Sequence, residues 1–81
     1  NKVSFSAFTF GENLILSGVR KYTLYSIEVF DMLGHCILKR NVDSNSYFND
    51  EFLIPAPKVK QFIVVLRGEY GEVLSSAKVL N

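Results

Sequence analysis

The strongest hydrophobic pattern in the chain is a run of five consecutive apolar residues, 62–66. Three of the five are β-branched, and polar residues and a glycine bound the run, which is typical of a short strand covered on both faces. Side chains alternate along a strand, so one face carries Phe62, Val64 and Leu66. We therefore predict that this strand lies in the middle of a sheet and that these three residues belong to the core.

Residues 73–80 form a weaker strand pattern, which follows a short connection containing Gly68 and Gly71. Glycine tolerates the positive φ angles of tight hairpin loops, so the two strands are expected to form a C-terminal hairpin. Serines and Lys78 interrupt the apolar positions of the second strand. This composition is typical of an edge strand, in which a lysine guards the unpaired backbone groups.

A second hairpin is predicted near the middle of the chain. Residues 25–31 alternate, and their core face would carry Tyr25, Ile27 and Val29. Asp31 and Gly34 have the spacing of a type I turn, in which the aspartate accepts from turn amides and the glycine takes the last position. The returning strand, residues 35–42, would then direct inward Cys36, Leu38 and Val42.

Weaker segments complete the pattern. Residues 2–10 alternate with Val3, Phe5 and Ala7 on one face and then change phase to Phe8 and Phe10. A change of phase by one residue predicts a bulge, or a strand that passes between two sheets. Short strands are expected at residues 14–16 and 51–54, and an exposed crossing loop or edge strand at residues 19–24.

The pattern as a whole predicts about seven short strands and no helix. Strands of this length, separated by turns and joined by hairpins, favour an all-β fold: an immunoglobulin-like antiparallel β-sandwich. A five-stranded oligonucleotide-binding barrel is the alternative architecture. The length of 81 residues predicts a single domain, 1–81. Since the chain begins at Asn1 without a methionine, we expect it to be a fragment of a longer protein.

Composition narrows the class of function. The net charge of +1 argues against a dedicated nucleic-acid binder, which usually presents a strongly basic face. The single cysteine, Cys36, excludes an intrachain disulfide and is expected to pack as a small buried hydrophobe. No apolar run approaches the length of about 18 residues that a transmembrane helix needs, so no transmembrane segment is expected.

Candidate chemistry is sparse. His35 follows the turn glycine and has no predicted partner that would make it a general base. The oxygen-rich segment 43–51 begins like a calcium loop but carries Tyr47 and Phe48 where the pattern needs an oxygen ligand and a glycine. We therefore expect no catalytic residue, no metal site and no cofactor, and the chain is not expected to be an enzyme.

Three segments resemble a known family. Residues 25–37 resemble that family's strand, Asp-x-x-Gly turn and returning strand. Residues 61–66 resemble its aromatic-led central strand, and Gly71 lies in the hairpin that follows. Residues 76–81 resemble its terminal strand, in which a lysine precedes the last apolar pair. Their order and spacing resemble the C-terminal sorting domain of the type IX secretion system, the type A Por secretion tail of Bacteroidota.

This resemblance implies a seven-stranded, immunoglobulin-like, non-catalytic domain at the C-terminus of an exported protein. The parent protein would pass through the periplasm, be recognised there through this domain, and cross the outer membrane by the type IX translocon. A sortase-like peptidase would then remove the domain at the cell surface and join the parent to anionic lipopolysaccharide, or the domain would be retained there. The identity of the parent protein stays open.

The edge-strand pattern predicts where recognition lies. An exposed edge allows a partner to add a strand through main-chain bonding that tolerates sequence variation. We expect the recognised surface to comprise Gly71, Lys78, Val79, Leu80 and Asn81, and the same edge could support a dimer. The competing hypothesis is a generic β-sandwich accessory module of a surface protein, either carbohydrate-binding or a spacer.

Overall fold

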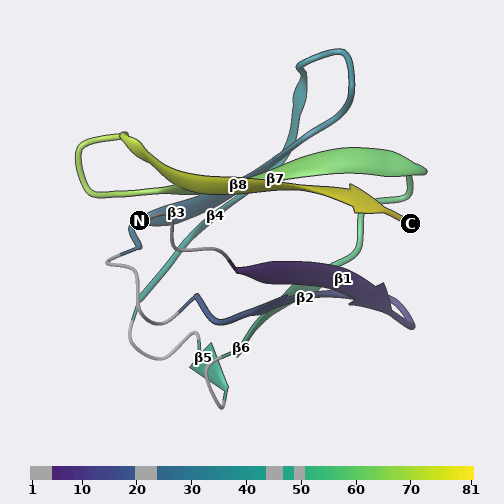
Figure 1. Ribbon diagram of the computed structural model, residues 1–81, viewed down its shortest axis with the longest axis horizontal. Helices are drawn as coiled ribbons and strands as arrows, with labels where there is room; N and C mark the ends of the chain where they lie inside the picture. The colour runs from purple at the N-terminus through teal and green to yellow at the C-terminus, as the bar shows by residue number, and fades with distance from the viewer. Residues whose placement is uncertain (1–4, 20–23, 44–46, 49–50) are drawn as a thin grey trace.

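The computed structural model is a sandwich of two antiparallel four-stranded sheets (Figure 1). It describes residues 5–19, 24–43, 47–48 and 51–81. One sheet has the order β1-β2-β6-β5 and the other β4-β3-β7-β8. The strands are β1 (Ser6–Phe10), β2 (Asn13–Ser17), β3 (Ser26–Phe30), β4 (Cys36–Asn41), β5 (Tyr47–Phe48), β6 (Glu51–Pro55), β7 (Gln61–Arg67) and β8 (Val73–Leu80).

The predicted all-β sandwich is confirmed. Seven of the strands have five or more residues, β5 has two, and the described residues contain no helix. Four strand pairs, β1–β2, β3–β4, β5–β6 and β7–β8, join strands that follow one another in the chain, and the remaining pairs, β2–β6 and β3–β7, join strands that are distant in sequence. The two sheets therefore each combine local and long-range pairing.

Strand β7 lies between β3 and β8, as its hydrophobic run predicts. The side chains of Phe62, Val64 and Leu66 are fully buried. Across β3, Ile27 pairs with Leu66 and Val29 with Val64, and both β3 side chains are also fully buried. The opposite sheet completes this core with four inward-facing residues of β2 and β6: Leu14, Leu16, Phe52 and Ile54.

The prediction that both faces of β7 are covered is wrong for its outer face. Ile63 and Val65 are only half-buried, because no third layer packs on this side of the described sandwich. Their neighbours across the sheet are side chains of the same face: Phe30 and Lys78 beside Ile63, and Glu28 and Ser76 beside Val65. The β-branched run is thus partly shielded by its cross-strand neighbours alone.

The hairpins β3–β4 and β7–β8 close with the same backbone geometry. In each, the backbone N–H of the residue before the turn donates to the carbonyl of the residue four positions later: Asp31 N–H to His35 O (2.9 Å) and Gly68 N–H to Glu72 O (2.9 Å). In each, a glycine N–H closes the turn, from Gly34 to Asp31 O and from Gly71 to Gly68 O, both at 3.1 Å. Both closing glycines have positive φ, 91° and 81°, which a residue with a Cβ atom adopts only with strain.

A bulge explains why Cys36 is exposed rather than buried. The register of β3 with β4 shifts between Val29, which faces Leu38, and Phe30, which faces Cys36. The extra residue, Ile37, reverses the side-chain phase of β4 at this point. Leu38 therefore packs against the core as predicted, whereas the thiol of Cys36 lies in solvent.

Three further expectations about facing are wrong. Phe5 and Ala7 face the core and Phe8 and Phe10 face outward, so β1 keeps one alternation and pairs with β2 without a bulge. Val3 lies outside the described residues.

Tyr25 is exposed because the backbone bends there and β3 begins only at Ser26. Val19, expected in an exposed segment, is fully buried in the core.

The buried position of Val64 makes a direct test of this core. Val64→Asp would place an unpaired carboxylate between the sheets, at a cost of several kcal/mol. A small domain has about 5–10 kcal/mol of total stability, so we expect this variant to be largely unfolded in a thermal melt followed by circular dichroism.

Gln61→Asp is the matched control, because Gln61 lies on the same strand but is exposed. It should melt within a few degrees of the parent, since surface substitutions usually change stability by less than about 0.5 kcal/mol. Equal melting of the parent and Val64→Asp would contradict the placement of β7.

Candidate functional site

The open edge of β8 is the longest unpaired backbone surface in the second sheet, because β8 has eight residues and pairs only with β7 in the described sandwich. Asn81 N–H donates to Lys60 O (2.7 Å), and Gly68 N–H donates to Glu72 O (2.9 Å). Antiparallel pairs alternate between bonded and non-bonded, so the Asn81 bond sets the phase of the ladder as far as the register shift between Leu66 and Arg67. The backbone groups of Ser76, Lys78 and Leu80 therefore point away from β7.

The predicted recognition residues divide between the edge and the core. Lys78 and Leu80 are exposed on the outer face of the sheet, and Leu80 has 71% of its surface accessible. Val79 is buried and pairs with Phe62, so its side chain belongs to the core and cannot contact a partner. By the same alternation the backbone groups of Val79 bond to β7, so Val79 offers the edge neither its side chain nor its main chain.

Asn81 fastens the end of β8 to the segment that precedes β7. Its side-chain amide donates to Pro57 O (2.9 Å) and to Val59 O (3.1 Å), in addition to its backbone bond to Lys60 O. This structural use of Asn81 was missed at the sequence level, since the contacts span 22 and 24 residues. A half-open cleft of about 330 Å³ lies beside it, lined by the β1–β2 turn and by residues 55–58.

The other end of β8 is fastened by Arg67. Its Nη1 donates to Gly71 O (2.7 Å) and its Nε to Glu28 Oε1 (2.6 Å). Lys39 Nζ lies 3.9 Å from the other oxygen of Glu28, whose side chain is only 13% exposed. The Gly71 turn is therefore held to the outer face of β3 and β7 by an ion-pair cluster. Arg67 and Asn81 thus hold the two ends of the β8 edge in place.

The predicted turn at Asp31 and Gly34 is present, and Asp31 does more than close it. The N–H groups of Leu33 and His35 both donate to Asp31 Oδ1, at 2.9 and 2.8 Å. His35 Nδ1 lies 3.2 Å from Oδ2, so His35 does have a partner, contrary to expectation. These contacts, led by the His35 N–H, lower the pKa of the Asp31 carboxyl below its ordinary value of 3.8.

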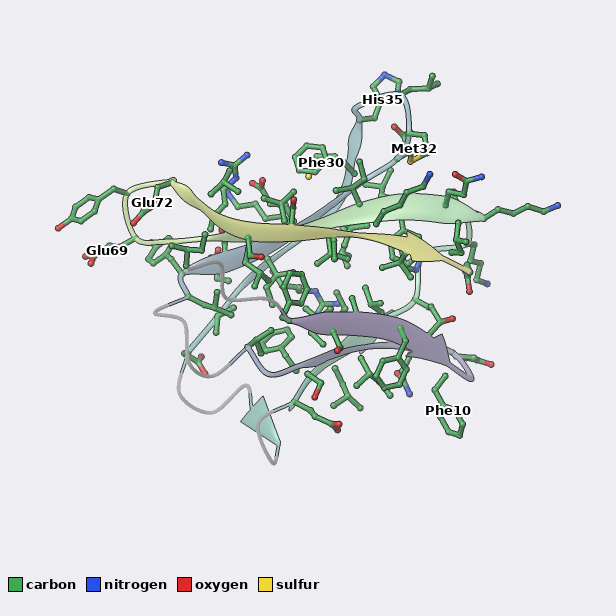
Figure 2. The ribbon with its side chains drawn as sticks, viewed as in Figure 1. Phe10, Phe30, Met32, His35, Glu69 and Glu72 are labelled. Atoms are coloured by element: carbon green, nitrogen blue, oxygen red, sulfur yellow. The ribbon has the colours of Figure 1, made fainter. Side chains whose placement is uncertain are left out.

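His35 and Met32 lie at the tip of the β3–β4 hairpin, which projects away from the opposite sheet (Figure 2). The His35 side chain is 73% exposed. Among the described residues, no three His, Cys, Asp or Glu side chains gather as a metal site would require. The part of the chain that the structure describes also contains no helix long and apolar enough to cross a membrane.

No family model, no curated protein and no solved structure matches this chain. The candidate site therefore rests on its own geometry: within the part of the chain that the structure describes, the outer edge of β8 is unpaired and its two ends are held by Arg67 and Asn81.

The low pKa of Asp31 predicts a pH-dependent contribution to stability. A carboxyl whose pKa falls on folding stabilises the fold above its unfolded pKa, and this contribution is lost as the pH falls through the folded pKa. We expect Asp31→Ala to lower the melting temperature at neutral pH, and the difference from the parent to shrink at low pH.

Thermal melts of both proteins between about pH 2.5 and pH 7 measure this difference. Asp31→Asn is the control, since it keeps an oxygen acceptor for the turn amides but loses the charge. A parent–Ala difference that stays constant over the whole range would show that the carboxylate charge contributes nothing.

Proposed function

We propose that this chain is a non-catalytic C-terminal sorting domain that directs its parent protein through the type IX secretion system. The observation that carries the proposal is the open, eight-residue edge of β8, with Lys78 and Leu80 exposed along it. The resemblance of residues 25–37, 61–66 and 76–81 to the Por secretion tail supports the same function. The domain would be carried through the periplasm to the outer membrane surface.

Strand addition at β8 is the proposed mode of recognition. The outward backbone groups of Ser76, Lys78 and Leu80 would bond to a strand of the translocon, because bonding through the main chain suits a receptor that accepts many different cargo sequences. The side chains of Lys78 and Leu80 would contact the partner on the outer face. A sortase-like peptidase and anionic lipopolysaccharide would act later, on the parent protein.

The competing function is that of a generic accessory module, either a carbohydrate-binding domain or a spacer. Nothing about an accessory module requires the β8 edge to stay open, whereas the sorting proposal requires it. The position of the domain in its precursor separates the two most cheaply. A full-length precursor that continues well beyond Asn81 would contradict the sorting function, and one that ends there after an N-terminal export signal would support it.

A proline at position 78 tests strand addition without unfolding the domain. The N–H of Lys78 points away from β7, so proline there removes one edge donor and leaves the β7–β8 ladder intact. We expect a reporter fused to the Lys78→Pro domain to accumulate in the periplasm of a bacterium that has the type IX translocon. Deleting residues 78–81 is a poorer test, since it removes Val79 from the core and the three bonds of Asn81.

Lys78→Ala is the matched control, because it removes the charge and keeps the N–H group. It should be exported far better than Lys78→Pro, and both domains should show the circular dichroism spectrum of the parent. Normal export of a folded Lys78→Pro domain would sink the proposal that β8 accepts a strand from the translocon.

A further inference from the structure

The outer face of the first sheet carries an unusual apolar band. The registers of β1 with β2 and of β2 with β6 set nine outward positions in three rows across these strands. The middle row is Phe8, Ile15 and Leu53; one flanking row is Phe10, Asn13 and Pro55; the other is Ser6, Ser17 and Glu51. The middle row is entirely apolar and Phe10 and Pro55 extend it on one side.

This band is open to solvent. Phe10 is 74% exposed, Phe8 44% and Leu53 43%, and Phe10 points away from the opposite sheet (Figure 2). An antiparallel sheet with one solvated face normally carries polar residues there. A contiguous apolar band on such a face marks an interaction surface. The outer face of the second sheet is different, because the Glu28–Arg67–Lys39 ion-pair cluster lies on it.

We propose that this face is the interface of a homodimer, in which two copies pack their β1-β2-β6 faces together. The two-fold axis lies between the faces, parallel to the strands, and passes beside Ile15 of both copies. This inference does not depend on the sorting function and uses a different surface from the β8 edge. A second copy is the occupant because the nine positions complement themselves under this symmetry.

The self-complementarity follows from the rows. A two-fold axis parallel to the strands keeps each row opposite its equivalent and places β1 of one copy over β6 of the other. Phe8 then packs on Leu53 of the second copy, and Phe10 on Pro55 of the second copy, with both contacts occurring twice. The only charged residue among the nine, Glu51, lies opposite the hydroxyl of Ser6, which can donate a hydrogen bond to it.

The alternative two-fold axis, perpendicular to the strands, gives a poor match. It would place Glu51 against Pro55 and Ser6 against Phe10, so that polar groups would lose water without gaining partners. Charge and polarity therefore favour the parallel axis. Sheets packed in this way keep their strands within about 30° of one another.

The size of the face sets the strength of the dimer. Three strands of five residues span about 14 by 17 Å, or roughly 240 Å² per copy, which is well below the low end of specific interfaces. Interfaces of this size form weak, transient complexes, so we expect association at protein concentrations of about 0.1–1 mM.

Sedimentation equilibrium of the chain measures this association. The mean mass should rise from 9.2 kDa toward twice that value as the concentration increases to about 1 mM. Ile15→Lys should keep the protein monomeric, because it places two lysines face to face on the axis. Phe10→Ser, at a highly exposed position that does not risk the fold, should weaken association several-fold.

Two control variants identify the surface. Val65→Lys alters a half-buried, outward residue of the other sheet and should dimerise as the parent does. Lys78→Pro should also leave the dimer intact, whereas its loss in this variant would assign the dimer to the β8 edge and overturn the proposal. A chain that remains monomeric at about 1 mM, or an Ile15→Lys variant that still dimerises, would overturn it equally.

The orientation has its own test. Ser6→Lys creates two ion pairs with Glu51 of the second copy only under the parallel axis, and should tighten the dimer about fivefold. Adding Glu51→Lys to the Ser6→Lys variant should abolish this increase in dimer affinity. If Ser6→Lys weakens the dimer instead, the parallel axis is wrong.

Discussion

The burial of one face of β7 against the opposite sheet is the interaction on which the rest of the structure depends. Phe62, Val64 and Leu66 lie at the centre of the core, and β3 and β8 pair with β7 on either side. A chain of 81 residues can bury only about 60–65% of the surface of its unfolded form, so it forms one core between two layers. Among the described residues, each sheet therefore has one buried face and one outer face that no further layer covers.

This two-layer design leaves edges and outer faces as the surfaces on which function can be built. The second sheet has its ion pairs outside, its longest strand at one edge, and both ends of that strand fixed by Arg67 and Asn81. The first sheet has an apolar band outside instead. The two proposals follow from this difference: strand addition at the β8 edge, and face-to-face association through β1, β2 and β6.

Local alternation and turn chemistry predicted the parts of the fold that depend only on neighbouring residues. The strand at residues 73–80, the position of β7 and the Asp31 turn are of this kind. The predictions failed where a single backbone event changes the phase, as at the bulge that exposes Cys36. They also failed at Phe8 and Phe10, where a change of phase was expected, because β1 keeps one alternation along its whole length and both side chains face outward.

The long-range contacts of the candidate site were beyond the reach of pattern alone. The bond from Arg67 to Glu28 joins residues 39 positions apart, and no local signal marks either residue as half of a pair. Asn81 was expected on a recognised surface, yet its side chain donates to two backbone carbonyls of the preceding segment. The edge position of β8, in contrast, was predictable because serines and lysine in place of apolar residues are what an unpaired edge tolerates.

Amide hydrogen exchange along β8 tests the central claim most directly, because it reports each backbone N–H separately. The ladder phase predicts that the amides of Ala77 and Val79, which bond to β7, exchange slowly, whereas those of Ser76, Lys78 and Leu80 exchange fast. Such an alternating pattern would confirm an open edge that is ready to accept a strand. Uniform protection across all five amides in the isolated, monomeric domain would contradict it.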